Sequence, residues 1–196
     1  MDNLPRPTAL LPVDHPLSYI HASKSTTAEP FVVAKTLEQQ TTYLYDHRLI
    51  SDLLNEYTYR IDTCMVDPAL VDRWVDLFTD DCKLTYAFGG HVGKKGLGKW
   101  AMYAESRFHR MIHLTSNSTI RFESADIAHG RSALFSSSGN EAKEITNNFL
   151  GGGYYYWSFR REQGEWKISS LYLDTVWVEG DSKGLNNPKG WEGYEA

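Results

Sequence analysis

The sequence predicts an α+β fold: a cone-shaped half-barrel in which a strongly curved antiparallel sheet wraps around three N-terminal helices. Two observations carry this prediction. In the first half of the 196-residue chain, apolar residues recur at three- and four-residue steps, which is typical of amphipathic helices. The second half consists of long stretches rich in β-branched and aromatic residues that short turn sequences separate, as in an antiparallel meander.

The helical part follows an N-terminal extension, residues 1–46, which contains most of the seven prolines and is expected to be at most partly ordered. After it, apolar residues have the spacing of a first amphipathic helix: Leu49, Ile50, Leu53, Leu54, Tyr57, Ile61 and Cys64. A second helix is predicted from Asp67, a capping residue followed by Pro68 in the first turn, to Phe78. A third helix is predicted over residues 99–108.

The strands are predicted by their composition and by the turns between them. A short strand is expected over residues 82–88, and the glycine-rich run GGHVGKKGLG after it is expected to connect over the mouth of the cone. Four long strands are expected near 110–123, 127–138, 145–161 and 165–179. Residues 47–180 are therefore predicted to form one domain, with residues 181–196 as a C-terminal tail.

Charge and composition narrow the class of partner. The net charge is −5 and no run of Lys and Arg is longer than a pair, so nucleic acid is not an expected partner. No apolar run reaches the roughly 18 residues that a membrane helix needs, and no signal peptide is evident, so we expect a cytoplasmic protein without a membrane partner. Cys64 and Cys82 are expected to be reduced. His109 and His113 have the spacing of helical zinc ligands but lie where a helix gives way to a strand, so neither metal nor cofactor is expected.

The run HLTSN, residues 113–117, indicates where chemistry could take place. Side chains alternate along a strand, so His113, Thr115 and Asn117 are expected to point into the cone. Asp62 lies about 80° from Leu54 around the first helix, at the margin of its apolar stripe, where a carboxylate can face a cavity. A carboxylate that accepts a hydrogen bond from one imidazole nitrogen raises the basicity of the other, which predicts a general acid/base pair.

The opposite face of the same strand predicts an assembly. Ile112, Leu114, Ile120 and Phe122 are expected to point away from the pocket, where the three helices cannot cover them. An apolar outer face of this kind favours a homo-oligomer, a dimer or a trimer. On the strand near residues 154–159, two alternating sets of side chains face opposite sides, and the sequence leaves open which set lines the pocket.

Several runs in a fixed order carry a resemblance to a known family. They are the aspartate that ends the first helix, DLFTDD after the second, HLTSN on a strand and GEWKI in the last hairpin. In this order, over about residues 47–180, they resemble the SnoaL-like group of the nuclear transport factor 2-like superfamily. Within that group the chain is most similar to the scytalone dehydratases, because its C-terminal run LDTVWVEGD also resembles theirs.

The resemblance implies a conical pocket in which Asp62 and His113 form the catalytic pair and Tyr86 helps to hold a water against a substrate carbonyl. It also shows departures, because Ile61, a serine at 137 or 138, Gly153 and Tyr155 stand where scytalone dehydratases have other substrate-contacting residues. A different substrate is therefore expected. Five residues are predicted to contact it: Asn117, Tyr155, Asn148, Trp177 and Tyr57.

The function predicted first is a cofactor-independent lyase or isomerase, a dehydratase or cyclase that acts on a small, oxygenated, largely apolar biosynthetic intermediate. Two alternatives stay open. The same fold also serves as a non-catalytic ligand-binding or protein-assembly module. A carboxyl acid in the same pocket could instead catalyse epoxide opening or a semipinacol rearrangement.

Overall fold

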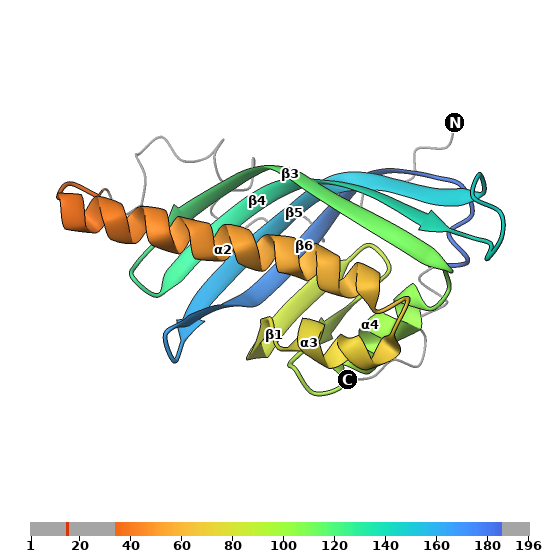
Figure 1. Ribbon diagram of the computed structural model, residues 1–196, viewed down its shortest axis with the longest axis horizontal. Helices are drawn as coiled ribbons and strands as arrows, with labels where there is room; N and C mark the ends of the chain where they lie inside the picture. The colour runs from red at the N-terminus through yellow and green to blue at the C-terminus, as the bar shows by residue number, and fades with distance from the viewer. Residues whose placement is uncertain (1–14, 16–33, 186–196) are drawn as a thin grey trace.

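The computed structural model describes residue 15 and residues 34–185, which form a six-stranded curved sheet with helices on its inner side (Figure 1). Helix α2 runs across the sheet, while α3 and α4 lie at one end of it beside β1 (Figure 1). The predicted α+β cone is therefore confirmed. In chain order the elements are α2 (Leu37–Thr63), the short 3-10 helix η2 (Pro68–Leu70), α3 (Val71–Val75), β1 (Phe78–Tyr86), β2 (Gly89–Val92), α4 (Leu97–Glu105), β3 (Arg110–Phe122), β4 (Ile127–Gly139), β5 (Asn148–Glu162) and β6 (Glu165–Glu179).

Helix α2 begins at Leu37, well before the expected start near Asp46. Thr36 accepts a hydrogen bond from the backbone N–H of Gln39, and the Gln39 side chain accepts one from the backbone N–H of Thr36, a reciprocal cap that fixes the start. Most residues of the first turns are exposed, so they show no apolar periodicity. Contact with the sheet begins at Tyr43, whose ring packs against Phe122, and the fully buried apolar stripe begins at Ile50.

The second predicted helix is shorter than expected, whereas the third, expected over residues 99–108, forms as α4 over Leu97–Glu105. Asp67 caps η2 by accepting from the backbone N–H of Ala69 at 3.0 Å, and α3 spans only Val71–Val75. Phe78, expected at the end of this helix, begins strand β1, because the neighbouring backbone joins the sheet. The glycine-rich run was expected to be a loop. Its first part instead forms β2, which pairs antiparallel with β1.

The sheet has the order β2-β1-β6-β5-β4-β3 and is mixed rather than wholly antiparallel. The four long strands form the predicted meander, with β3, β4, β5 and β6 antiparallel to their neighbours. Strand β1, however, pairs with β6 in parallel. Composition predicts where strands occur but not which strand will lie beside the last one, so the sequence did not indicate this pair.

A bulge in β3 changes which residues of the strand face inward, from odd-numbered ones before it to even-numbered ones after it. Ser116 pairs with Ala133 while Thr119 pairs with Arg131, so β3 has one residue more than β4 between these pairs. Asn117 lies in the bulge with φ of 51°. The prediction that Ile112, Leu114, Ile120 and Phe122 share one outer face is therefore wrong. The first two are half exposed, whereas Ile120 and Phe122 belong to the buried core.

Within residues 34–185, no helix combines the length and the apolar character needed to cross a membrane.

Candidate active site

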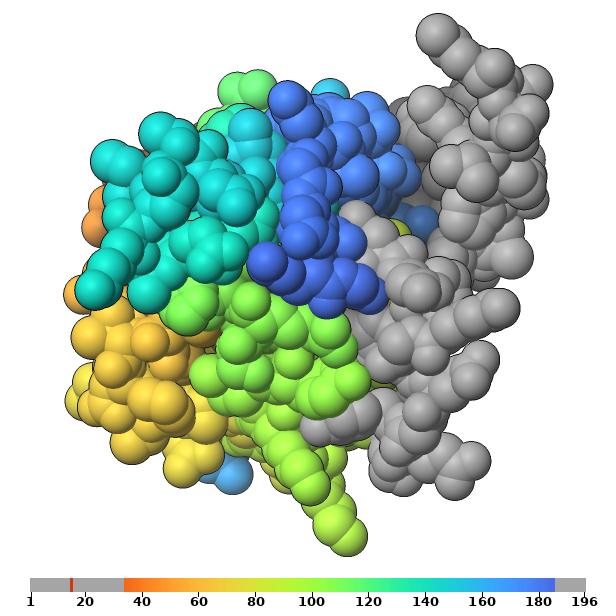
Figure 2. All heavy atoms as spheres, turned by 90° about the vertical axis from the view of Figure 1, so that its right-hand side faces the viewer, coloured from red at the N-terminus to blue at the C-terminus, as the bar shows by residue number. Residues whose placement is uncertain are grey.

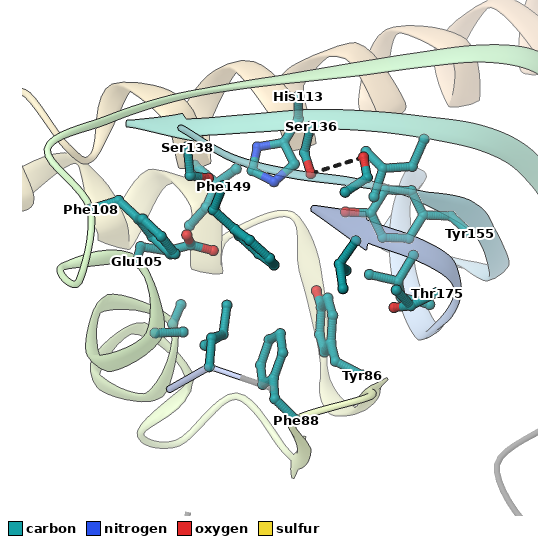
Figure 3. Close-up of a pocket in the computed structure, with 18 of the residues that line it drawn as sticks. Tyr86, Phe88, Glu105, Phe108, His113, Ser136, Ser138, Phe149, Tyr155 and Thr175 are labelled. Atoms are coloured by element: carbon teal, nitrogen blue, oxygen red, sulfur yellow. Dashed lines mark hydrogen bonds between the residues drawn. The ribbon is translucent and has the colours of Figure 1, made fainter. Parts of the chain in front are cut away.

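A cavity of about 860 Å³, including the part that opens to solvent, lies inside the cone between the sheet and the helices. The space inside it that is open to the centre of a water-sized sphere is about 90 Å³. At the end of the molecule seen in Figure 2, α4, the β4–β5 connection and the end of β6 meet. The end of α4, the start of β5 and the end of β6 supply Glu105, Phe149 and Val178 to the wall. Most of the lining is aromatic or aliphatic, so its few polar side chains stand out (Figure 3).

Asp62 and His113 form a hydrogen-bonded pair at this cavity. The Nδ1 atom of His113 lies 2.6 Å from Oδ1 of Asp62, and the backbone N–H of His113 donates to Oδ2 at 2.9 Å. The pair forms because the last turn of α2 packs against β3. Both carboxylate oxygens are thus engaged by one residue, which fixes the imidazole ring and leaves its Nε2 atom available to a bound molecule.

The surroundings of His113 increase its basicity. Its side chain is only 13% exposed, and burial by itself lowers the pKa of an imidazole. The hydrogen bond and the negative charge of Asp62, with a further contribution from Glu105, outweigh burial and raise the pKa of His113 above its usual value. The site therefore suits a group that accepts a proton and holds it next to a carboxylate.

Three tyrosines meet on another part of the wall. Tyr57 from α2, Tyr86 from β1 and Tyr155 from β5 all line the cavity, and the hydroxyl oxygens of Tyr57 and Tyr86 lie 2.6 Å apart. Burial raises the pKa of all three hydroxyls. They are therefore neutral at physiological pH and can donate hydrogen bonds. On β5 it is Tyr155, and not Tyr154, that faces inward, which answers the question left open by the sequence.

Three of the residues expected at the substrate do not line the cavity. Asn117 is exposed, because the bulge breaks the alternation that was expected to align it with His113. Trp177 lies on the outer face of the sheet, where it packs over Gly152 and against Phe135. Asn148 begins β5, and its side chain donates to the carbonyl of Ile145.

The structure also brings a residue to the cavity that the sequence did not single out. Glu105, the last residue of α4, lines the wall near His113 (Figure 3). Burial raises the pKa of its carboxyl to about 7; the charge of His113 opposes this shift and that of Asp62 adds to it. The one available signal was its helical spacing, because Glu105 follows Ala101 by four residues and thus lies on the apolar face of α4.

Neither the histidines nor the cysteines form a metal site in the described part of the chain. Among these residues, no group of three or more His, Cys, Asp and Glu side chains is placed to hold a metal ion. Cys64 and Cys82 are buried and form no disulfide, and burial raises the pKa of each thiol to about 11.

Comparison with known proteins agrees with this architecture. The solved structures that share the fold include three that each cover 72% of this chain. The first is a protein from Novosphingobium aromaticivorans proposed to be a scytalone dehydratase, with 24% identity, coverage of 72% of this chain and 91% of that one, and a TM-score of 0.64. The second is a type 2 hexachlorocyclohexane dehydrochlorinase, with 21% identity, coverage of 72% and 93%, and a TM-score of 0.62. The third is another N. aromaticivorans protein, proposed to be an aromatic ring hydroxylase, with 19% identity, coverage of 72% and 97%, and a TM-score of 0.61. No curated protein sequence matches the chain. The family model for the SnoaL-like domain matches residues 42–172, so this chain belongs to the SnoaL-like family, as its motifs predicted.

Proposed function

We propose that this protein is a cofactor-independent lyase or isomerase, of the dehydratase or cyclase type, that acts on a small, oxygenated, largely apolar biosynthetic intermediate. One observation carries the proposal. A histidine held by a buried carboxylate presents its second nitrogen to a cavity whose walls are otherwise mainly apolar. Such an arrangement supplies a general base in a partly desolvated site, which is what removal of a proton from carbon requires.

The proposed reaction begins at a carbon next to a carbonyl group. The Nε2 atom of His113 takes the proton, and the charge of Asp62 stabilises the imidazolium that forms. Tyr86 donates a hydrogen bond to the carbonyl oxygen as negative charge develops there. Loss of a group from the neighbouring carbon then gives elimination, attack on an internal electrophile gives cyclisation, and return of the proton to another carbon or to the opposite face gives isomerisation.

The structural neighbours support a proposal of this class without deciding it. One of the three is a dehydrochlorinase and another is proposed to be a dehydratase. Both names describe elimination reactions. All three share less than 25% identity with this chain, and one fold serves many activities. The pair formed by Asp62 and His113 therefore carries more of the proposal than the neighbours do.

Hydrogen exchange tests the proposed base without requiring the natural substrate. The wild-type chain should speed the exchange of the α-protons of an aromatic ketone such as α-tetralone in D₂O, followed by NMR. We expect His113→Ala to remove most of a roughly 10²- to 10⁴-fold acceleration, while circular dichroism shows an intact fold. Wild-type exchange no faster than that of the buffer would contradict the proposal and would favour a non-catalytic binding module.

One observation favours a second candidate, epoxide opening or a semipinacol rearrangement by a carboxyl acid. Glu105 is a partly buried carboxyl on the same wall, with a pKa raised to about 7. In that chemistry the acid acts alone, so His113→Ala would leave most of the activity in place. The same variant therefore separates the two candidates.

A further inference from the structure

We propose that Glu105 is the proton donor for a leaving group, so that the site eliminates water from a β-hydroxy carbonyl compound. This inference rests on the proposed function and narrows it. A base alone suffices when the leaving group is already stable as an anion. Hydroxide is a poor leaving group, so a site built for dehydration needs an acid as well as a base.

The placement of Glu105 suits an acid. Its carboxyl points into the cavity from the end of α4, close to the rings of Phe108 and Phe149 (Figure 3). No hydrogen bond from the described residues reaches its oxygens. A carboxylate without a partner on an apolar wall is costly, so the neutral acid is favoured there. The raised pKa of Glu105 agrees with this argument from geometry.

The two carboxyl groups of the site have separate environments. Asp62 accepts from the ring and from the backbone of His113, so neither of its oxygens is left for a substrate. Glu105 has both oxygens free to contact a bound molecule. Carboxyl groups whose surroundings differ in this way commonly divide the work of catalysis, one staying charged and the other serving as the acid.

Other titratable groups surround Glu105 on the elements packed around it. They are Asp62, Tyr57 and Cys64 from α2 and its end, Tyr86 from β1, His113 from β3 and Tyr155 from β5. Burial keeps the tyrosines and the cysteine neutral near pH 7. The protons that can move in the site are therefore those of His113 and Glu105.

The order of the polar groups around the cavity agrees with the order of the functional groups in a β-hydroxy carbonyl compound. In Figure 3 the hydroxyls of Tyr86 and Tyr155 lie on one side of the cavity and Glu105 on the other, with His113 between them in this view. A substrate with its carbonyl oxygen at the tyrosines would place its α-carbon near His113. Its β-hydroxyl would then lie toward Glu105.

The proposed step balances. His113 takes the α-proton, and the electron pair of that C–H bond becomes the new C=C bond. The β-carbon–oxygen bond breaks, and the departing oxygen takes the proton of Glu105 and leaves as water. The site then holds an imidazolium and a carboxylate, and transfer of one proton from His113 to Glu105 through water restores the starting state.

A pair of compounds that differ only in the leaving group tests the inference. One is the β-hydroxy ketone formed from benzaldehyde and acetone, and the other is its acetate ester. Both give benzylideneacetone on elimination, which absorbs in the near ultraviolet. We expect Glu105→Gln to slow elimination from the alcohol by roughly 10²- to 10⁴-fold and from the acetate by less than about threefold, because acetate leaves without a proton. Glu165→Gln, a change at an exposed carboxylate at the start of β6, is the matched control.

The outcomes distinguish this inference from the proposed function. Equal loss with both compounds in Glu105→Gln would overturn the role of Glu105 as the leaving-group acid. No loss with either, while His113→Ala abolishes both eliminations, would overturn it too and leave the proposed base in place. Unchanged elimination in His113→Ala would overturn the proposed function itself. A wild type that eliminates acetate but not water would also contradict the inference.

A second measurement needs no substrate. Difference infrared spectroscopy should show the C=O stretch of a protonated carboxyl at mildly acidic pH that disappears as the pH rises through about 7. The band should be absent from Glu105→Gln and present in Glu165→Gln. A wild type without this band at mildly acidic pH would show that Glu105 carries no proton to donate, and the inference would fail.

Discussion

The two faces of the sheet each carry a histidine hydrogen-bonded to a carboxylate, and only one of the pairs is placed for catalysis. On the inner face His113 lies 2.6 Å from Asp62, and on the outer face His129 lies 2.7 Å from Glu123. Both rings are largely buried. The distance between ring and carboxylate therefore does not distinguish the pairs.

The difference lies in the second nitrogen and in the carboxylate. The Nδ1 atom of His129 is engaged by the Ser158 hydroxyl at 3.1 Å, so both of its nitrogens are occupied. Its partner Glu123 is 49% exposed, whereas Asp62 is 17% exposed. Neither His129 nor Glu123 lines the cavity that His113 reaches. A free nitrogen that faces a cavity, rather than the ion pair itself, marks the inner pair as the catalytic candidate.

The largest expected difference between the two pairs appears when the carboxylate of each is changed to the matching amide. Asp62→Asn should lower turnover by roughly 10²- to 10⁴-fold, since an amide can hold the ring but cannot stabilise its positive charge. Glu123→Gln should leave turnover within about twofold. Steady-state kinetics on any compound that the wild type converts provides the measurement.

Combining Asp62→Asn with His113→Ala should lower turnover little more than either change alone, because the two residues act as a unit. Additive losses would show instead that they work independently.

The next largest expected effect is on self-association through the outer face of the sheet. We propose that a second copy of the chain covers the exposed apolar side chains of this face in a dimer or a trimer. These side chains are those of Ile112, Leu114, Phe135, Tyr154 and Trp177. Leu114→Lys would bury an unpaired charge in that contact, which should cost about 3 kcal/mol, roughly a hundredfold in the dissociation constant. Light scattering at micromolar concentration measures the change. Tyr59→Lys, on the exposed side of α2, is the control. A wild-type monomer under these conditions would contradict the proposal.

The pH dependence of the free energy of unfolding should reveal the raised pKa of Glu105. Its pKa rises from an ordinary 4.5 to about 7 on folding, so between these values the folded chain binds more protons than the unfolded chain. The free energy of unfolding should therefore fall as the pH rises through this window. At pH above 7, Glu105→Gln should be more stable than the wild type by roughly 1 to 3 kcal/mol, with little difference below pH about 4.5. Urea unfolding across this pH range tests it, and parallel curves for both proteins would show that the carboxyl is not perturbed.

The smallest effect is expected at Tyr86. Tyr86→Phe removes one of the hydroxyls near the proposed carbonyl position but leaves Tyr57 and Tyr155, so turnover should fall by roughly tenfold. The Michaelis constant should change less than kcat, because the hydrogen bond strengthens as charge develops. A change confined to the Michaelis constant would indicate that Tyr86 only binds the substrate.

Much of the fold could be predicted because the relevant patterns are local. Apolar residues at helical spacing located α2, and turn signals located the four long strands. The sequence pattern did not predict the start of α2, because the first turns of this helix are polar and exposed. The parallel pairing of β1 with β6 depends on contacts between distant segments, which periodicity does not report.

The candidate site was predictable to a similar extent. Strand alternation and helical position suggested that His113 and Asp62 would meet, and they do. Glu105 was missed, because a glutamate in the last turn of a nine-residue helix is ordinarily solvated. What buries it comes from elsewhere in the chain, including Phe149 on β5 and Leu185 beyond β6, so its character is set by tertiary structure.

The bulge at Asn117 gives β3 a tolerance for a change in length. Odd-numbered residues before the bulge and even-numbered residues after it point inward, and both halves of the strand keep their register with β4. Deletion of Asn117 would leave the two strands with equal numbers of residues between the flanking pairs, so regular alternation would keep His113 at the cavity and Phe122 in the core. Related sequences can therefore differ by one residue between the histidine and the core half of this strand, provided that the bulge is gained or lost with it.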